Sequence, residues 1–232
     1  MRDQAVFTVD RLELTFAPRP WAFANERRAE IDAYFAALKR KNPSLWNGRI
    51  LMLYEQRLEQ GIFHGAYLET DYASFAAWIG WGWPQAGIYD CFGTGAIMAS
   101  DGAFLLGVMS PRTLNAGHIY FPCGTPDPSD IVDGKVDLDF SVRRELEEET
   151  GLSVAEFETE PGWTMVVDGS LIAQVKVFRA RDTAEQLRER ILAHLAHEER
   201  PELADIRIAR GAGDLDAKMR GFVRTFLGHR WR

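Results

Sequence analysis

Three glutamates between residues 144 and 152 are spaced so that their carboxylates would share one face of a helix. Residues three and four positions apart are neighbours on a helix, so Glu145 lies beside both Glu148 and Glu149. Each like-charged pair destabilises a helix by roughly 0.2–0.5 kcal/mol, and a bound divalent cation reverses the sign of that effect. Ligation by carboxylate oxygens alone favours Mg²⁺ or Mn²⁺ over Zn²⁺. The spacing predicts a metal site here, and a solvent-exposed acidic face is the alternative.

Two neighbours of these glutamates have different expected roles. Arg144 lies one helical turn before Glu148 and could hold that carboxylate through a charge-assisted hydrogen bond. Glu147 is about 200° from Glu145 around the helix, so it should point away from the other carboxylates. Glu145, Glu148 and Glu149 are therefore the predicted metal ligands and catalytic carboxylates, with Arg144 as their support.

Composition and charge exclude several classes of protein. The chain has 232 residues, 46% of them hydrophobic, which allows one large domain or two small ones. Nine acidic and three basic residues lie between 127 and 149, and they account for most of the net charge of −7. The sequence contains no stripe of Lys and Arg, so binding to nucleic acid is not expected. The uncharged stretch 72–89 is interrupted by glycines and a proline, so we expect a buried helix and a turn rather than a membrane span.

Cysteine usage and the first twenty residues favour a cytoplasmic location. Cys91 and Cys123 are too few for a disulfide framework, which fits a reducing compartment. The first twenty residues contain several charges and no apolar stretch, so no secretory signal is expected.

Hydrophobic periodicity predicts an α/β chain. In the first part we expect a strand at 7–16, a helix at 21–41, strands at 49–57 and 62–69, and a helix at 72–80 capped by Asp71. In the second part, Asp101 and Gly102 join the strands 93–99 and 103–109 into a hairpin. A strand at 118–121, a loop at 122–136 and a helix from an Asp139 cap to Gly151 follow. The last expected elements are strands at 153–158, 162–167 and 171–179 and helices at 183–198 and 213–228.

Residues 144–152, RELEEETGL, reproduce the R-E-U-x-E-E-x-G-U part of the Nudix signature, in which U is apolar. The residues Phe121 to Gly124 are similar to the Phe-Pro-Gly-Gly that precedes the Nudix loop. The chain therefore resembles the Nudix hydrolases over about 91–232. The resemblance implies an α/β/α sandwich with a mixed sheet, preceded by an N-terminal α+β extension at 1–90 that contributes substrate or dimer contacts.

The loop before this motif departs from the family pattern. Val136 occupies the position of the upstream glutamate, and Asp130 occupies the position of the first glycine. If Gly124 is the family's glycine, six extra residues lie in the loop between 125 and 136. Asp133 or Asp137 could replace the missing carboxylate. Cys123 stands where the family usually has glycine, and we interpret it as a packed thiol rather than a nucleophile.

What the resemblance implies is hydrolysis of the diphosphate in a nucleoside diphosphate linked to a second group X. Mg²⁺, or Mn²⁺, would neutralise and orient the diphosphate and activate a water. The general base is expected among Glu198, Glu199 and Glu202, with Glu199 preferred, or on the helix itself. Arg112 and Gly124 are predicted substrate contacts, with an ordinary surface role as the alternative for Arg112.

The first ninety residues give a short further resemblance. Residues 42–48, NPSLWNG, are similar to the region before the Nudix domain in UDP-sugar-hydrolysing Nudix proteins. Trp78, Trp81 and Trp83 could stack on a base or sugar, or pack between the two parts of the chain or in a homodimer. The expected partner is thus a small nucleotide, such as a nucleotide sugar. A Nudix-fold sensor without turnover and a hydrolase that removes nucleoside triphosphates are the alternatives.

Overall fold

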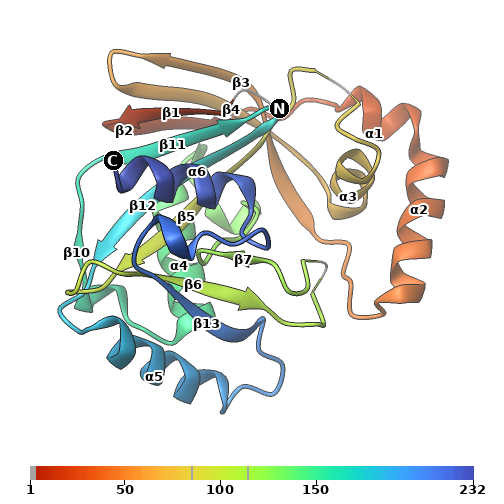
Figure 1. Cartoon of the computed structure of the whole chain (residues 1–232). Coiled ribbons are helices and arrows are strands. Elements are labelled where there is room, and N and C mark those ends of the chain that lie inside the picture. Colours follow the sequence, from red (N-terminus) through yellow and green to blue (C-terminus); the bar gives the residue numbers. More distant parts are fainter. Residues whose placement is uncertain (1–3, 85, 114) are drawn as a thin grey trace.

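Two mixed β-sheets form the framework of the protein in the computed structural model, which describes residues 4–84, 86–113 and 115–232 (Figure 1). The larger sheet has the order β1-β11-β12-β5-β6-β13, with β10 beside β12 and β7 beside β6. Its strands are β1 (Gln4–Val9), β5 (Asp90–Met98), β6 (Phe104–Met109), β7 (Ile119–Tyr120), β10 (Glu158–Thr159), β11 (Trp163–Asp168), β12 (Leu171–Arg179) and β13 (Leu203–Ala209). β12 and β5 are parallel, and the other pairs are antiparallel.

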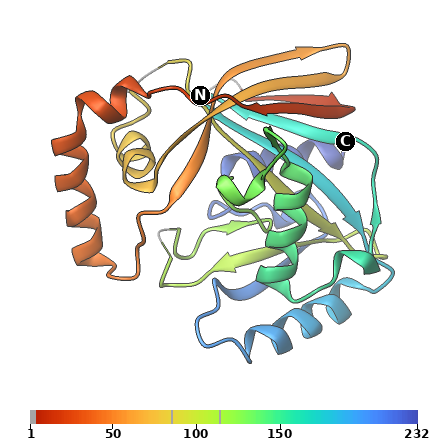
Figure 2. The ribbon, with the colours of Figure 1, turned by 180° about the vertical axis from the view of Figure 1, so that it is seen from behind.

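Helices cover both faces of this sheet, and neighbouring residues of β5 show why. Phe92 packs against Phe222 of α6 (Gly221–Arg230), with ring centroids 5.4 Å apart. Gly93 faces the other side, where an added Cβ would lie 2.4 Å from Val142 of α4 (Leu138–Thr150). Glycine on β5 thus lets α4 lie close to the sheet. Figure 2 shows α4 on the face opposite α6, and α5 (Ala184–Leu195) packs against β13. The predicted α/β/α sandwich is confirmed.

A smaller sheet and three helices come mainly from the first part of the chain. The sheet has the order β3-β4-β2-β9-β8. Its strands are β2 (Arg11–Phe16), β3 (Arg49–Glu59), β4 (Ile62–Asp71), β8 (Ile131–Val132) and β9 (Lys135–Val136), and its helices are α1 (Ala22–Glu26), α2 (Arg28–Lys41) and α3 (Tyr72–Gly80). A second hydrophobic core, centred on the fully buried Trp78, lies between this sheet and the helices. The predicted strands 49–57 and 62–69 and the helix 72–80 with its Asp71 cap are confirmed.

Two elements expected near the N-terminus are each divided. The predicted strand 7–16 is wrong as a single strand, because the chain leaves the larger sheet at Val9 and enters the smaller one at Arg11. At the crossing, the Asp10 N–H donates to the Gly61 carbonyl over 2.7 Å. Alternation is the same on both sides of Asp10, so the pattern could not show that the partners differ. The predicted helix 21–41 breaks at Arg27.

Several expected elements after α4 are also corrected. The predicted strand 153–158 is instead a 3₁₀ turn at Val154–Glu156, closed by a Ser153 capping box, followed by the two-residue β10. No expected element covers the residues between 198 and 213, where the structure forms the strand β13. The helix predicted at 183–198 ends at Leu195, and the one predicted at 213–228 begins at Gly221 after a 3₁₀ turn at Ala212–Asp214.

On each side of the expected boundary near residue 90, some strands pair with the sheet that belongs mainly to the other part of the chain. β1 joins the larger sheet, whereas β8 and β9 join the smaller one through the pair Thr15 and Lys135. The division into 1–90 and 91–232 stays a prediction, as do the homodimer and the cytoplasmic location. Within the described ranges, no helix is long and apolar enough to cross a membrane.

Candidate active site

The glutamate helix α4 is defined by its two ends. Its N-cap is Asp137, whose Oδ1 accepts from the Phe140 N–H over 3.0 Å, so the predicted Asp139 cap is wrong. Asp139 instead pairs with Arg143 one turn later, at 2.6 Å. The helix ends as predicted at Gly151, which adopts the left-handed conformation with φ 67°. Its apolar residues Val142 and Leu146 pack under β5 and fix the position of the helix.

The three predicted carboxylates differ greatly in exposure. Glu149 is buried at 7% exposure, and the Glu145 side chain is 15% exposed. The Glu148 side chain is 61% exposed and projects from the helix. Glu147 points away as expected, and its Oε1 accepts from the Val154 N–H over 2.9 Å. Two carboxylates are therefore held in place at the site, and the third is free to approach them.

Arg144 connects these carboxylates to the lengthened loop. Its Nη1 lies 2.8 Å from Glu145 and 3.4 Å from Glu148, in agreement with the predicted supporting role. Its Nη2 lies 3.3 Å from Asp130, which is fully buried and was not predicted as a site residue. Asp130 closes a capping box with Asp127, so the extra loop residues form an ordered turn that holds the arginine. The sequence D-P-S-D is the signal from which this turn could have been found.

Burial raises the pKa values of the two inner carboxyl groups. Desolvation, with Glu148 and Glu202 adding repulsion, raises the pKa of Glu145 to about 7, although Arg144 opposes the rise. Desolvation and repulsion from Glu145 and Glu202 raise the pKa of Glu149 well above its usual range. A cation at this position would relieve both effects.

The donor set fits a hard cation. Its atoms are carboxylate oxygens, the inner two are desolvated, and the charge that would balance them is only partly supplied by Arg144. Among the residues that the structure describes, no group of three His, Cys, Asp or Glu side chains is already gathered into a metal cage. Binding a cation would thus require the exposed Glu148 side chain to turn towards Glu145 and Glu149.

The loop that follows the strand β7 packs directly on these carboxylates. The Cys123 N–H donates to Oε1 of Glu149 over 3.2 Å. A Cβ added to Gly124 would lie 2.3 Å from Oε1 of Glu145, so glycine is required for this close approach. Burial and the nearby Glu149 raise the pKa of the Cys123 thiol well above its usual range, as expected for a packed thiol rather than a nucleophile.

A cavity of about 590 Å³ opens beside Glu145 and gathers cationic side chains. Arg49, Arg112 and Arg200 line it, together with Gly124 and Glu202. The fold thus brings to one cavity three of the site residues predicted from the sequence, Glu145, Arg112 and Gly124.

The loop after α5 contributes to the same cavity, with a division of roles between its glutamates. Glu202 lines the cavity, and its charge acts on both Glu145 and Glu149. Glu199, the preferred base in the sequence, contributes its backbone carbonyl to Arg112 Nη1, at 3.3 Å. Its carboxylate is not among the groups that line the cavity.

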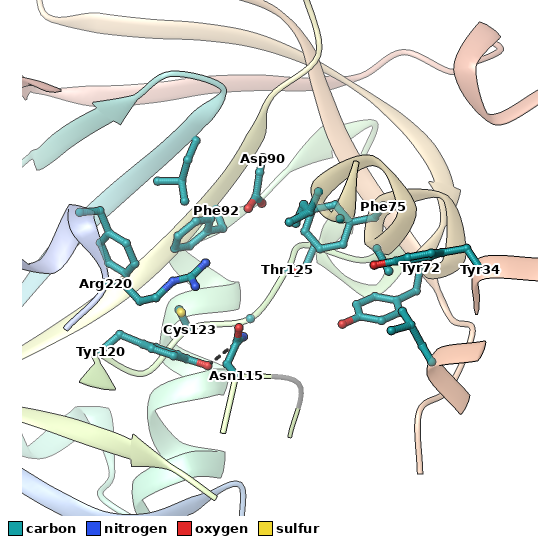
Figure 3. Close-up of a pocket in the computed structure, with 17 residues that line it drawn as sticks. Tyr34, Tyr72, Phe75, Asp90, Phe92, Asn115, Tyr120, Cys123, Thr125 and Arg220 are labelled. Atoms are coloured by element: carbon teal, nitrogen blue, oxygen red, sulfur yellow. Dashed lines mark hydrogen bonds between the residues drawn. The ribbon is translucent and has the colours of Figure 1, made fainter. Parts of the chain in front are cut away.

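A second cavity, of about 320 Å³, adjoins the first and is drawn in Figure 3. The two share Cys123, Gly124 and Thr125 on their rims. Aromatic rings from α2, α3, β5 and α6 line the smaller cavity, and the buried Asp90 and the half-buried Arg220 point into it. No local sequence pattern predicts that these two residues share a cavity, because they are 130 positions apart and only the tertiary fold brings them to it.

Trp78, Trp81 and Trp83, the candidate stacking residues, pack in the second core. Trp78 is fully buried, and its ring centroid lies 5.8 Å from Trp21 and 4.5 Å from Trp83. Trp81 packs against Phe23 and Tyr34. None of the three is among the residues that line the two cavities beside Gly124, so the packing interpretation is favoured.

Comparisons with known proteins find matches among solved structures but not among family models or curated proteins. Two solved structures are similar to about 60% of it, each with a TM-score of 0.37. One is a Nudix hydrolase from M. smegmatis, RenU, at 14% identity over 81% of that chain. The other is the MutT protein from Methanosarcina mazei Go1, at 18% identity over 91% of that chain. Because both likenesses are low, the activity is argued from the chain's own side chains.

Proposed function

We propose that this chain is a divalent-metal-dependent pyrophosphohydrolase that cleaves the diphosphate of a nucleoside diphosphate linked to a group X, such as a nucleotide sugar. The observation that carries the proposal is the contact between Gly124 and Glu145. Through this contact the Glu145 carboxylate, which belongs to a motif resembling the Nudix signature, lies at the wall of a cavity that three arginines also line. A ligand with concentrated negative charge that binds together with metal cations fits such a cavity better than a neutral ligand does.

Glu145, Glu148 and Glu149 would hold Mg²⁺, or Mn²⁺, and Arg144 would orient the first two. When bound, the cation neutralises the diphosphate and lowers the pKa of a water. Arg144 would release Glu148 towards the cation and remain paired with the buried Asp130. The arginine thus keeps a counter-charge in both arrangements, which limits the cost of the rearrangement.

The remaining groups of the cavity are assigned to the substrate. Arg112 and Arg200 would contact the phosphate oxygens, which matches the substrate role predicted for Arg112. Glu202 would accept the proton of the water that attacks phosphorus as the P–O bond to the leaving phosphate breaks. Its place in the cavity supports this choice over Glu199, whose carbonyl positions Arg112.

The test is release of nucleotide products from a panel of UDP-, ADP- and GDP-sugars, dinucleoside polyphosphates, coenzyme A and nucleoside triphosphates, with Mg²⁺. The double variant Glu148→Gln and Glu149→Gln should lose turnover and keep its fold. Glu147→Gln is the matched control, because that side chain lies on the same helix and points away from the site.

Each outcome of this assay supports or contradicts one of the hypotheses on function. Turnover of one diphosphate-linked class, lost in the double variant and kept in the control, supports the proposal. Equal activity in the double variant and the wild type contradicts the metal-site assignment. Tight binding of one nucleotide without turnover favours the sensor, and activity on triphosphates alone favours the triphosphate hydrolase.

A further inference from the structure

The smaller cavity contains a buried acid and a guanidinium that the protein itself leaves unpaired. Asp90, the first residue of β5, is 8% exposed. Within the described part of the chain, its carboxylate forms no hydrogen bond or ion pair, and the same holds for the Arg220 side chain. Arg220 is near enough to oppose the rise in the pKa of Asp90, which burial brings to about 7. A buried carboxylate without donors is costly, so a ligand that supplies N–H groups would be stabilised here.

The walls of this cavity suit a flat ring. Phe92 and Phe222 form the side that belongs to the larger sheet and α6, whereas Tyr72 and Phe75 of α3 face them from the N-terminal part. Figure 3 shows the Asp90 carboxylate and the Arg220 guanidinium directed into the space between these walls. The volume of about 320 Å³ accommodates a heterocycle of two fused rings and part of an attached sugar.

The two charged groups select among the nucleobases. Guanine has two neighbouring donors, N1–H and the N2 amino group, and on its next edge the acceptors O6 and N7. A carboxylate accepts from the first pair, and a guanidinium donates to the second. Adenine places the acceptor N1 beside its amino group, and uracil has one N–H between two carbonyl oxygens. Neither base gives an ionised carboxylate two donors.

We infer that this cavity binds the guanine base of the nucleotide substrate, with Asp90 accepting from N1–H and the N2 amino group and Arg220 donating to O6 and N7. The inference rests on the proposed function for the identity of the ligand as a nucleotide. The shared rim at Gly124 and Thr125 supports it, because a base in this cavity leaves its phosphates beside Glu145 in the larger one. The N-terminal part of the chain would then build one wall of the base site.

The test is calorimetric binding of GMP, AMP, UMP and XMP to the intact protein in EDTA, so that neither metal nor turnover is involved. GMP should bind about tenfold or more tightly than UMP or AMP, the range expected for one bidentate contact. Asp90→Asn should lose that preference and gain relative affinity for XMP, whose O2 carbonyl accepts from the new amide. Arg220→Gln should weaken GMP without favouring XMP. The control Asp101→Asn has the same charge change in the turn after β5.

Equal affinity for the four nucleotides, or a preference for AMP or UMP, would overturn the guanine assignment. An Asp90→Asn protein with wild-type selectivity would do the same. These outcomes are separate from the hydrolysis test. Sugar-nucleotide turnover without base preference would contradict only this inference, whereas guanine-selective binding without any hydrolysis would contradict only the proposed activity.

Discussion

Replacing Gly124 by alanine tests whether the contact between the loop after β7 and α4 sets the position of the Glu145 carboxylate. The new Cβ would lie 2.3 Å from Oε1 of Glu145, whereas ordinary contacts begin at 3.4 Å. Only the end of a flexible side chain stands in the way, so the Glu145 carboxylate has to move by about 1 Å and the backbone can stay in place.

The expected effect is large on activity and small on stability. A displacement of about 1 Å at a reacting group can reduce the rate by about a hundredfold, equivalent to about 2.7 kcal/mol of transition-state stabilisation. The thermal midpoint should shift little, because only the end of the flexible Glu145 side chain has to move. A hundredfold loss with a nearly unchanged midpoint is therefore the signature of a misplaced ligand.

The assay is kcat/KM on the diphosphate substrate, with thermal unfolding of the same preparations. Gly228→Ala is the matched control, since its Cβ would meet no atom within 4 Å and it lies in a helix, where alanine adds roughly 0.5–1 kcal/mol of stability. In a Glu145→Ala background the Gly124 change should have no further effect. Retention of activity within threefold, or an equal loss in both backgrounds, would refute the reasoning.

Three further outcomes follow from buried groups. The pKa of Asp90 rises on folding from 3.8 to about 7, so the native state binds the extra proton and this group should lower stability by up to about 4 kcal/mol as the pH rises through that window. Urea unfolding of Asp90→Asn should show a fall that is smaller by that amount, because Glu145 still titrates in the same range. Leu146→Ala, in the core under β5, should cost about 2–5 kcal/mol in the same assay. Asp71→Ala should lower the thermal midpoint by removing a helix cap worth about 0.5–2 kcal/mol, whereas Asp71→Asn should retain most of it.

Local sequence information was sufficient for the elements whose signals lie within a few residues. The α4 helix has an apolar stripe, a left-handed glycine stop and acids three and four apart, and the structure forms it nearly as predicted. The α3 helix with its Asp71 cap and the hairpin at Asp101 and Gly102 are further cases. The motif at 144–152 therefore pointed to the helix face on which the proposed metal ligands lie.

Errors occurred where a local pattern fits two answers. A cap at Asp137 and a cap at Asp139 both precede the same apolar stripe, and only the N–H that each side chain reaches decides between them. The segment 153–158 has a strand-like composition, but Ser153 forms a capping box that turns the chain instead. β13 has no tight turn beside it, so its pairing with β6 depends on residues almost a hundred positions earlier.

The sequence by itself determined α3, α4, the hairpin and the set of glutamates, because helix periodicity and capping act over a few residues. Only the tertiary structure decided the transfer of the chain between sheets at Asp10, the pairing of Arg144 with the buried Asp130, and the placement of Asp90 and Arg220 at one cavity. Packing brings these distant positions together, and burial then sets their electrostatics. A local pattern contains neither the partner nor the degree of burial.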